Sequence, residues 1–243
     1  MNISIQPLGD SGAKVEFYHE VTPELNRTIQ LFCQKLSEFP ISGVIEWVPA
    51  YDSVGIYYDF RKITYAEIVD EITKLHDRVV EVDSQPIRLV HIPVTYGAEY
   101  GPDLGRVSKH NNCSESDVIK LHQEKKYLVY MLGFLPGFPY LGGMVHEIAT
   151  PRLDNPRDKI IAGSVGIADQ QTGIYPLASP GGWNIIGRTP VLLFEKKKEN
   201  AFLFRAGDYV KFDEVSNEEF LIIKEQVEEG TYEPQVEMLN GGE

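Results

Sequence analysis

Three phrases that lie close together in the chain decide its fold class: GFLPGFPYLGG (Gly133–Gly143), TPRLDNPR (Thr150–Arg157) and AGSVGIADQQTGIYPLASPGGWNIIGRTP (Ala162–Pro190). Glycine and proline are dense across them, and no long helical period interrupts them. Many short strands joined by Gly/Pro turns are typical of β-barrels and sandwiches. We therefore predict a mainly-β barrel domain over residues 85–243, ending in an acidic helix and tail.

Residues 1–84 precede this barrel and have a different pattern, in which strands and helices alternate. Thr22-Pro23 opens the first helix with a capping hydroxyl and a proline at the first helical position. Thr64 and Glu67 form a capping box for the second. The predicted order is strands at 3–5 and 15–17, a helix at 22–39, strands at 44–48 and 54–58, and a helix at 64–79. One layer of strands and two helices that each bury one face predict an α+β sandwich, which we expect to be ferredoxin-like.

The other elements of the second domain follow from apolar runs and helix caps, after a hinge that we place at Gln85-Pro86. Strands are predicted at 87–94, 127–132, 191–194, 202–204 and 209–212, and helices at 104–110, 114–126 and 216–229. The chain has no internal repeat and no low-complexity segment, so we expect two ordinary globular domains.

The chain is strongly acidic, with a net charge of −13 over 243 residues. This argues against a nucleic-acid surface and against adsorption to anionic membranes, since both need clustered Lys and Arg. Residues 213–243 contain ten acidic residues and one lysine, so this segment carries −9 and the rest of the chain −4. The acidic segment is either a docking surface for a basic partner or a solvated helix face with a loose end.

Cysteine, histidine and glycine spacing excludes several kinds of site. Cys33 and Cys113 are the only cysteines and lack C-x-x-C spacing, which favours a reducing compartment. The six histidines show no metal-ligand spacing, and neither nucleotide-binding glycine motif occurs, so we expect no metal and no cofactor bound by this chain. No signal-peptide pattern and no apolar stretch long enough to span a bilayer is present, so we expect a cytoplasmic protein.

The three phrases predict a small-ligand or partner pocket. Rigid loops that bring the backbone close to a ligand are a common reason for so much glycine and proline. Ligand sites are typically apolar slots with a few polar groups. The candidate lining residues are Phe134, Pro136, Phe138, Tyr140, Tyr175 and Trp183. The alternative is a tightly wound barrel in which the glycines only permit sharp bends.

Polar candidates lie in the same segment. Arg152, Arg157 and Arg188 are candidate contacts for a carboxylate or phosphate, unless the first two pair with nearby aspartates. The Gly181-Gly182 backbone can direct N–H groups at an oxyanion. Ser164 is a nucleophile or a polar anchor, although it lacks the G-x-S-x-G spacing of a nucleophile elbow. The catalytic residues stay unassigned.

These phrases resemble the bacterial KipI family, also called the 5-oxoprolinase B subunit (PxpB) family or allophanate hydrolase subunit 1. The resemblance covers nearly the whole chain. It rests on Pro7–Asp10, Glu46–Tyr51, Gly133–Leu141, Pro151-Arg152, Pro156-Arg157, Ala162–Ala168, Tyr175-Pro176, Ser179–Trp183 and Ile186–Pro190. The chain departs from the family at Ile161, where proline is usual, and at Asp169, where glycine is usual.

The resemblance implies that the second domain is a cyclophilin-like β-barrel. It also implies work with two partner subunits, one of the LamB/YcsF family and one resembling a carboxyltransferase domain, in an ATP-dependent 5-oxoprolinase that opens 5-oxoproline to glutamate. ATP would then be held by a partner subunit. Family members have also been assigned inhibition of a sporulation histidine kinase, which is the alternative function. The allophanate hydrolase label is a weaker alternative.

Overall fold

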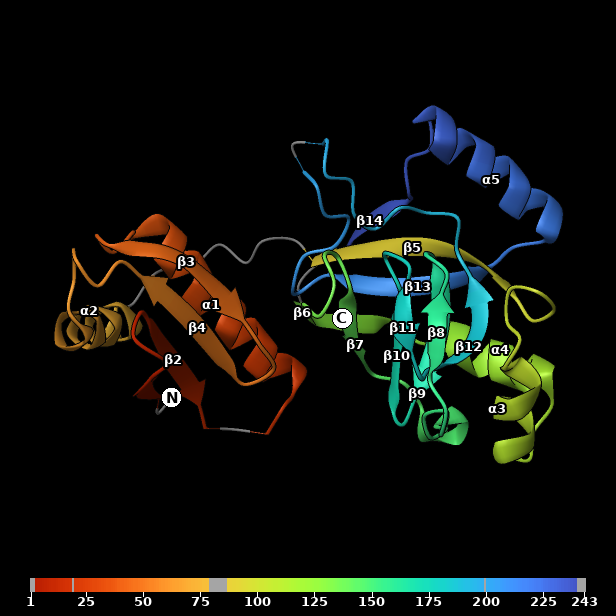
Figure 1. Cartoon of the computed structure of the whole chain (residues 1–243), viewed down its shortest axis with the longest axis horizontal. Helices are drawn as coiled ribbons and strands as arrows, with labels where there is room; N and C mark the ends of the chain where they lie inside the picture. Colours follow the sequence, from red (N-terminus) through yellow and green to blue (C-terminus); the bar gives the residue numbers. More distant parts are fainter. Residues whose placement is uncertain (1–2, 19, 79–86, 199, 240–243) are drawn as a thin grey trace. The chain divides into compact units, whose positions relative to one another are not determined.

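The computed structural model describes residues 3–18, 20–78, 87–198 and 200–239. The chain forms two compact units, residues 1–85 and 86–243 (Figure 1). Each unit has its own apolar core. The predicted hinge at Gln85-Pro86 lies outside the described residues. Among the described helices, none combines the length and the apolar character that crossing a membrane requires.

The first unit is one antiparallel sheet with two helices. Its elements are β1 (Ile3–Pro7), β2 (Gly12–Phe17), α1 (Pro23–Glu38), β3 (Val44–Pro49), β4 (Ser53–Tyr58) and α2 (Tyr65–Asp77). The strands lie in the order β1-β2-β4-β3. Alternate strand residues such as Val15 and Ile56 share one buried cluster with Ile29 of α1 and Ile72 of α2. Both helices therefore cover the same face of the sheet.

The helix starts in this unit follow the predicted chemistry. The Thr22 hydroxyl accepts a hydrogen bond from Leu25 N over 3.2 Å, and Pro23 is the first helical residue. Thr64 and Glu67 form the predicted capping box, in which Thr64 N donates to the Glu67 carboxylate over 2.8 Å. These contacts satisfy backbone N–H groups that a helix cannot pair internally.

The first unit has the predicted elements, but a ferredoxin-like arrangement is not confirmed. A ferredoxin-like unit has the chain order βαββαβ. Here two strands precede each helix, so the order is ββαββα, and consecutive strands pair directly as hairpins. The strand and helix positions predicted from the sequence already have the order ββαββα. The ferredoxin-like fold that we expected was therefore inconsistent with our own predicted elements.

The second unit is a closed barrel, as predicted. Its strands are β5 (Ile87–Tyr96), β6 (Tyr127–Leu132), β7 (Pro139–Gly142), β8 (Arg157–Ile160), β9 (Ser164–Ala168), β10 (Gln171–Ile174), β11 (Ser179–Gly181), β12 (Asn184–Arg188), β13 (Tyr209–Glu214) and β14 (Val236–Leu239). Its helices are α3 (Leu104–His110), α4 (Glu115–Glu124), the short η1 (His146–Ile148) and α5 (Asn217–Glu229). Strands β12-β9-β10-β7-β6-β13-β5 pair in that order, and β5 pairs with β12 to close the ring. Strand β14 adds to β5, and β8 pairs separately with β11 (Figure 1).

Two strand predictions for this unit are wrong; the short strands after Gly133 were expected only as a group, and β14 was not expected at all. Residues 191–194 and 202–204 are not strands, since only the isolated bridge between Phe194 and Phe202 joins them. Leu193 and Phe204 are buried in the main core, so single apolar side chains rather than a ladder fix this segment. Strand β14 was missed because it is four residues long, largely exposed, and flanked by polar residues.

A polar chain crosses the barrel interior at His122 of α4. Its Nε2 lies 2.8 Å from the Thr172 hydroxyl, and its Nδ1 lies 2.8 Å from the Tyr96 hydroxyl. Thr172 donates its one hydroxyl hydrogen to Gly166 O, so His122 Nε2–H donates to Thr172 and Tyr96 donates to Nδ1. Full burial lowers the pKa of His122 to about 3, which keeps the ring neutral. This network ties α4 to strands β5 and β10.

Candidate functional site

The structure brings the predicted aromatic residues together around Phe138. Its ring centroid lies 5.4 Å from that of Tyr140, 5.5 Å from Tyr175, and 5.7 Å from Phe134 and from Trp183, all in edge-to-face contacts. Such pairs are favourable beyond simple burial. Phe138, Tyr175 and Trp183 are buried and belong to a small core beside the main barrel core. These three rings form a packed cluster, and the exposed part of the set is Phe134 and Pro136.

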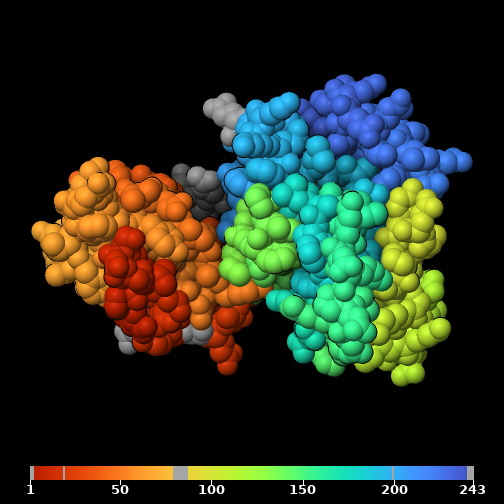
Figure 2. Space-filling model, viewed as in Figure 1, coloured from red at the N-terminus to blue at the C-terminus, as the bar shows by residue number. Residues whose placement is uncertain are grey.

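Phe134 differs from the other rings because it faces solvent. The residue is 69% exposed and has a φ of 66°, which is an uncommon and strained conformation for a bulky residue. A tight turn holds it, in which Leu135 N donates to Gly133 O over 2.8 Å and Phe138 N donates to Leu135 O over 3.0 Å. The light-green atoms of this turn lie at the surface of the second unit (Figure 2). Backbone strain that presents an apolar ring to solvent is typical of a contact site.

Arg157 is held by a partner within the chain. Its Nη2 donates to Asp103 Oδ1 over 2.7 Å, and its Nη1 lies 3.5 Å from Trp183 O. The other carboxylate oxygen of Asp103 accepts from Ile185 N over 2.7 Å. Asp103 is 7% exposed, so the pair fixes β12 and the start of β8 against the loop before α3. The alternative prediction was that Arg157 pairs with an aspartate close to it in the sequence. It pairs instead with Asp103, which is distant in the sequence.

Arg152 is more exposed than Arg157. Its Nε lies 3.4 Å from Asp169 Oδ2, and the two side chains are 58% and 63% exposed. An ion pair this exposed is weak and exchanges readily with an incoming anion. The charge of Arg152 also acts on Tyr175, where it opposes the effect of burial, and the net result raises the pKa of Tyr175 to about 12. Arg152 therefore lies close to the aromatic cluster and is open to solvent.

The remaining candidates have mainly structural contacts. Arg188 Nε donates to Ala162 O over 3.0 Å. A Cβ on Gly181 would lie 2.5 Å from the Tyr175 hydroxyl, so glycine is required there by close packing. Gly182 has more room, and its carbonyl accepts from Leu153 N over 2.7 Å. Ser164 is 5% exposed on β9, where it pairs with Arg188 in the ladder to β12.

Sequence reasoning missed Asp103, which is central to this arrangement. It lies 54 positions before Arg157 in the chain, so no local motif joins them. The local signal is an aspartate directly before the predicted helix at 104–110, a position where such a residue normally caps the helix. In the structure no side-chain capping bond is formed at this helix, because both carboxylate oxygens are used by Arg157 and Ile185.

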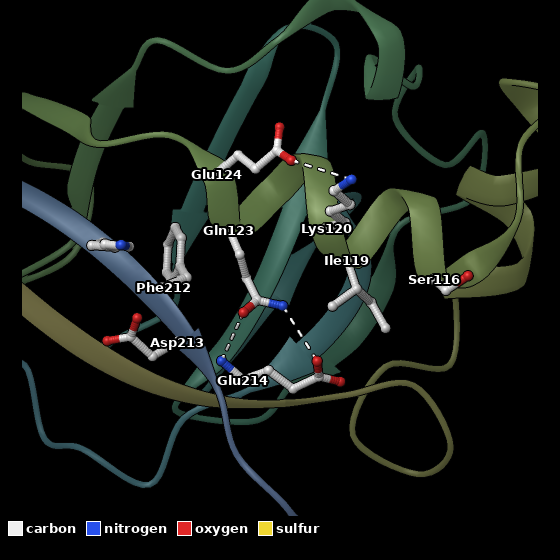
Figure 3. A pocket seen from close by; sticks show the side chains of 9 residues that line it. Ser116, Ile119, Lys120, Gln123, Glu124, Phe212, Asp213 and Glu214 are labelled. Carbon is white, nitrogen blue, oxygen red and sulfur yellow. Dashed lines mark hydrogen bonds and ion pairs between the residues drawn. The ribbon is translucent and has the colours of Figure 1, made fainter.

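Two surface grooves lie elsewhere on the second unit. One, of about 550 Å³, runs between α4 and β13 (Figure 3). Across it Glu214 N donates to Gln123 Oε1 over 3.1 Å, and along α4 the Lys120 ammonium lies 3.7 Å from the Glu124 carboxylate (Figure 3). The other, of about 870 Å³, lies beside residues 191–205. Neither is lined by a predicted site residue, and among the described residues no group of three or more His, Cys, Asp or Glu is placed to hold a metal ion.

Known proteins resemble this chain over most of its length. The family described as carboxyltransferase domain, subdomain C and D, matches residues 3–204. The 5-oxoprolinase B subunit of Bacillus subtilis is 41% identical over 233 residues, which are 91% of this chain and 97% of that protein. The protein of the same name from Escherichia coli O157:H7 is 36% identical over 205 residues, which are 84% of this chain and 93% of that one.

Solved structures share the fold. The crystal structure of TTHA0988 matches with a TM-score of 0.75 and 35% identity, covering 85% of this chain and 40% of the solved one. The present chain thus spans two fifths of that protein. The K. lactis urea amidolyase shows the same fold with a TM-score of 0.77 at 20% identity, over 97% of this chain and 16% of the enzyme. The resemblance inferred from the glycine- and proline-rich phrases is confirmed, and the chain belongs to the family of 5-oxoprolinase B subunits.

Proposed function

We propose that this chain is a subunit of an ATP-dependent 5-oxoprolinase, which opens 5-oxo-L-proline to L-glutamate, and that it contributes a contact site around Phe134 and Arg152. The observation that carries this proposal is the match to relatives named as the B subunit of 5-oxoprolinase over 84–91% of the chain. Its partners are a subunit of the LamB/YcsF family and a subunit resembling a carboxyltransferase domain. ATP is held by a partner, and this chain works in the cytoplasm.

The chemistry of 5-oxoproline suits the exposed part of the site. The substrate is a small ring with one carboxylate and an amide that resists hydrolysis. The guanidinium of Arg152 has only an exposed ion pair to exchange for that carboxylate. Phe134 offers an exposed ring face at the edge of the aromatic cluster, which can cover an apolar ring or a partner side chain.

Arg157 is assigned a different role from Arg152. Because its guanidinium neutralises the buried Asp103, it positions the loop that carries Trp183 rather than binding substrate. Loss of activity on Arg157 substitution would therefore not identify a substrate contact. Arg152 is the residue whose removal tests anion binding directly.

The experiment is reconstitution of the complex from this chain and the two partner subunits. Glutamate release from 5-oxoproline and ATP hydrolysis are measured with all three present and with each omitted in turn. We expect activity only with all three, and no activity with allophanate in place of 5-oxoproline. Undiminished glutamate release without this chain contradicts the proposal.

Single variants then test the site. Arg152→Ala should raise the KM for 5-oxoproline roughly tenfold or more, because one charge-assisted contact is lost. Phe134→Ala should lower activity without changing the melting temperature by more than a few degrees, since the ring is largely exposed. Lys120→Ala is the matched control, because Lys120 is an exposed cation in the groove between α4 and β13. Equal effects of all three variants would refute the site.

A further inference from the structure

The larger groove of the second unit has a composition that suits a ligand of its own. We name it the Arg88 groove and define it by Arg88, Leu192, Phe202, Arg205 and Tyr232, which are among its lining residues. Its volume of about 870 Å³ is within the range of small-molecule sites. Four parts of the chain contribute to it: the start of β5, the end of β6 at Leu132, residues from the stretch between Val191 and Arg205, and the end of α5 with the segment after it. In Figure 2 the light-blue atoms around residue 200 lie beside the darker blue atoms of α5.

One wall of this groove is apolar and open to solvent. Leu192 is 46% exposed and Phe202 is 47% exposed. The Phe202 ring packs on that of Phe194, with centroids 5.2 Å apart, so it is held in place while one side stays open. Tyr232 adds a third apolar face from the segment after α5. Exposed apolar side chains gathered around a hollow are typical of binding sites.

The other wall is cationic and braced. The Arg88 side chain is 18% exposed, its Nη1 lies 3.3 Å from Asp208 Oδ2, and its Nη2 donates to Leu203 O over 3.2 Å. The same Asp208 oxygen accepts from the backbone N of Arg205 over 2.8 Å, and Arg205, which is exposed, also lines the groove. Asp208 balances one of the two guanidinium groups.

Lys198 at the rim pairs with Glu195 over 2.5 Å and so adds no net charge. The described groove therefore has one positive charge in excess, held by Arg205, on a chain whose net charge is −13. A local positive charge on an acidic protein, next to apolar walls, selects an anion with an apolar body. The positive charge disfavours amines. Small hydrophilic anions would leave the apolar wall without a contact.

We propose that the Arg88 groove binds a small organic carboxylate with an apolar body. The carboxylate lies on Arg205 and on the braced guanidinium of Arg88, and the apolar body lies against Leu192 and Phe202. This site shares no residue with the one around Phe134 and Arg152 and does not depend on the proposed oxoprolinase activity. Leu132 lines the groove and directly precedes Gly133, so a ligand in the groove would lie next to the turn that holds Phe134.

Titration of the full chain with octanoate tests whether the Arg88 groove binds such a carboxylate. Binding is measured by isothermal titration calorimetry and by changes in ¹⁵N–¹H chemical shifts. We expect saturable binding of octanoate, roughly tenfold tighter than that of octylamine or acetate, with the largest shifts in residues 88, 192, 202 and 205. Equal binding of octanoate and octylamine, shifts that map elsewhere, or no saturable binding would overturn the proposal.

Two variants separate the charge from the apolar wall. Arg205→Gln keeps the length of an exposed side chain and should weaken octanoate binding roughly tenfold, with the melting temperature unchanged. Leu192→Gln should weaken octanoate binding several-fold, and should leave the affinity for acetate unchanged. Lys120→Gln, which removes an exposed cation in the groove between α4 and β13, is the matched control and should have no effect. Unchanged octanoate affinity in Arg205→Gln, or an equal loss in Lys120→Gln, refutes the assignment.

Discussion

Replacing Arg157 by alanine should destabilise the second unit, whereas replacing Arg152, five positions earlier in the same loop, should not. Arg157 pairs with Asp103 over 2.7 Å, with side-chain exposures of 33% and 10%. Arg152 pairs with Asp169 over 3.4 Å, with exposures of 58% and 63%. The two arginines thus make the same type of contact in very different surroundings.

The magnitude follows from those surroundings. Breaking a fully buried pair by removing one partner costs about 3–5 kcal/mol, because a charge is left buried without compensation. Exposed pairs contribute about 0–1 kcal/mol. Asp103 keeps its hydrogen bond from Ile185 N, and Arg157 is one third exposed, so we expect an intermediate loss of about 2 kcal/mol for Arg157→Ala. For Arg152→Ala we expect less than about 0.5 kcal/mol.

The assay is urea unfolding followed by tryptophan fluorescence. The chain has two tryptophans, and Trp47→Phe leaves Trp183, which is 7% exposed, as the reporter of the second unit. The double variant Asp103→Asn/Arg157→Ala should lose less stability than the sum of its single variants, since each removes the same contact. Similar unfolding midpoints for Arg157→Ala and Arg152→Ala would refute the reasoning.

Three further predictions concern stability, strain and reactivity. Burial lowers the pKa of His122 to about 3, so the ring stays neutral in the fold between pH 6.5 and 3, whereas the unfolded chain takes up a proton there. His122 should therefore lower the free energy of unfolding by about 1.4 kcal/mol for each pH unit below 6.5. His122→Gln should reduce this pH dependence, and an unchanged dependence would contradict the prediction. Asp169→Gly should change the free energy of unfolding by less than about 1 kcal/mol, since a φ of 54° suits glycine and the lost pair with Arg152 is exposed. A fall in the melting temperature of more than about 4 °C would contradict this. Iodoacetamide should modify Cys113 before Cys33, because Cys33 is 8% exposed and burial raises its pKa to about 12; equal rates by mass spectrometry would contradict this.

The sequence predicted those features that depend on neighbours in the chain. The helix starts at Thr22 and Thr64 depend on contacts within three residues, and both are present. The density of glycine and proline after Gly133 predicted short strands and a barrel, and the second unit has them. The apolar runs at 191–194 and 202–204 were predicted as strands, but they are irregular segments that each bury one apolar side chain in the main core. The local sequence pattern of such a segment is the same as that of a short strand.

The candidate site was predicted only in part, because its contacts join distant residues. The aromatic rings do meet, but Phe138, Tyr175 and Trp183 are buried and pack on one another. No local pattern indicates that Arg157 lies against Asp103, since the pairing depends on how the barrel closes. The Arg88 groove joins residues from four separate segments, so no local motif indicates it.

The motif residues of this chain therefore divide into those that build the loops and those that the loops present. Gly181 admits the Tyr175 hydroxyl, and Arg157 neutralises Asp103, so both act inside the protein. Phe134 is held in a strained backbone conformation by the turn between Gly133 and Phe138, and it is 69% exposed although its ring also contacts that of Phe138. Internal contacts account for Gly181 and Arg157, whereas Phe134 keeps most of its surface open to solvent. We therefore expect substitutions at the presented residues to change function more than folding.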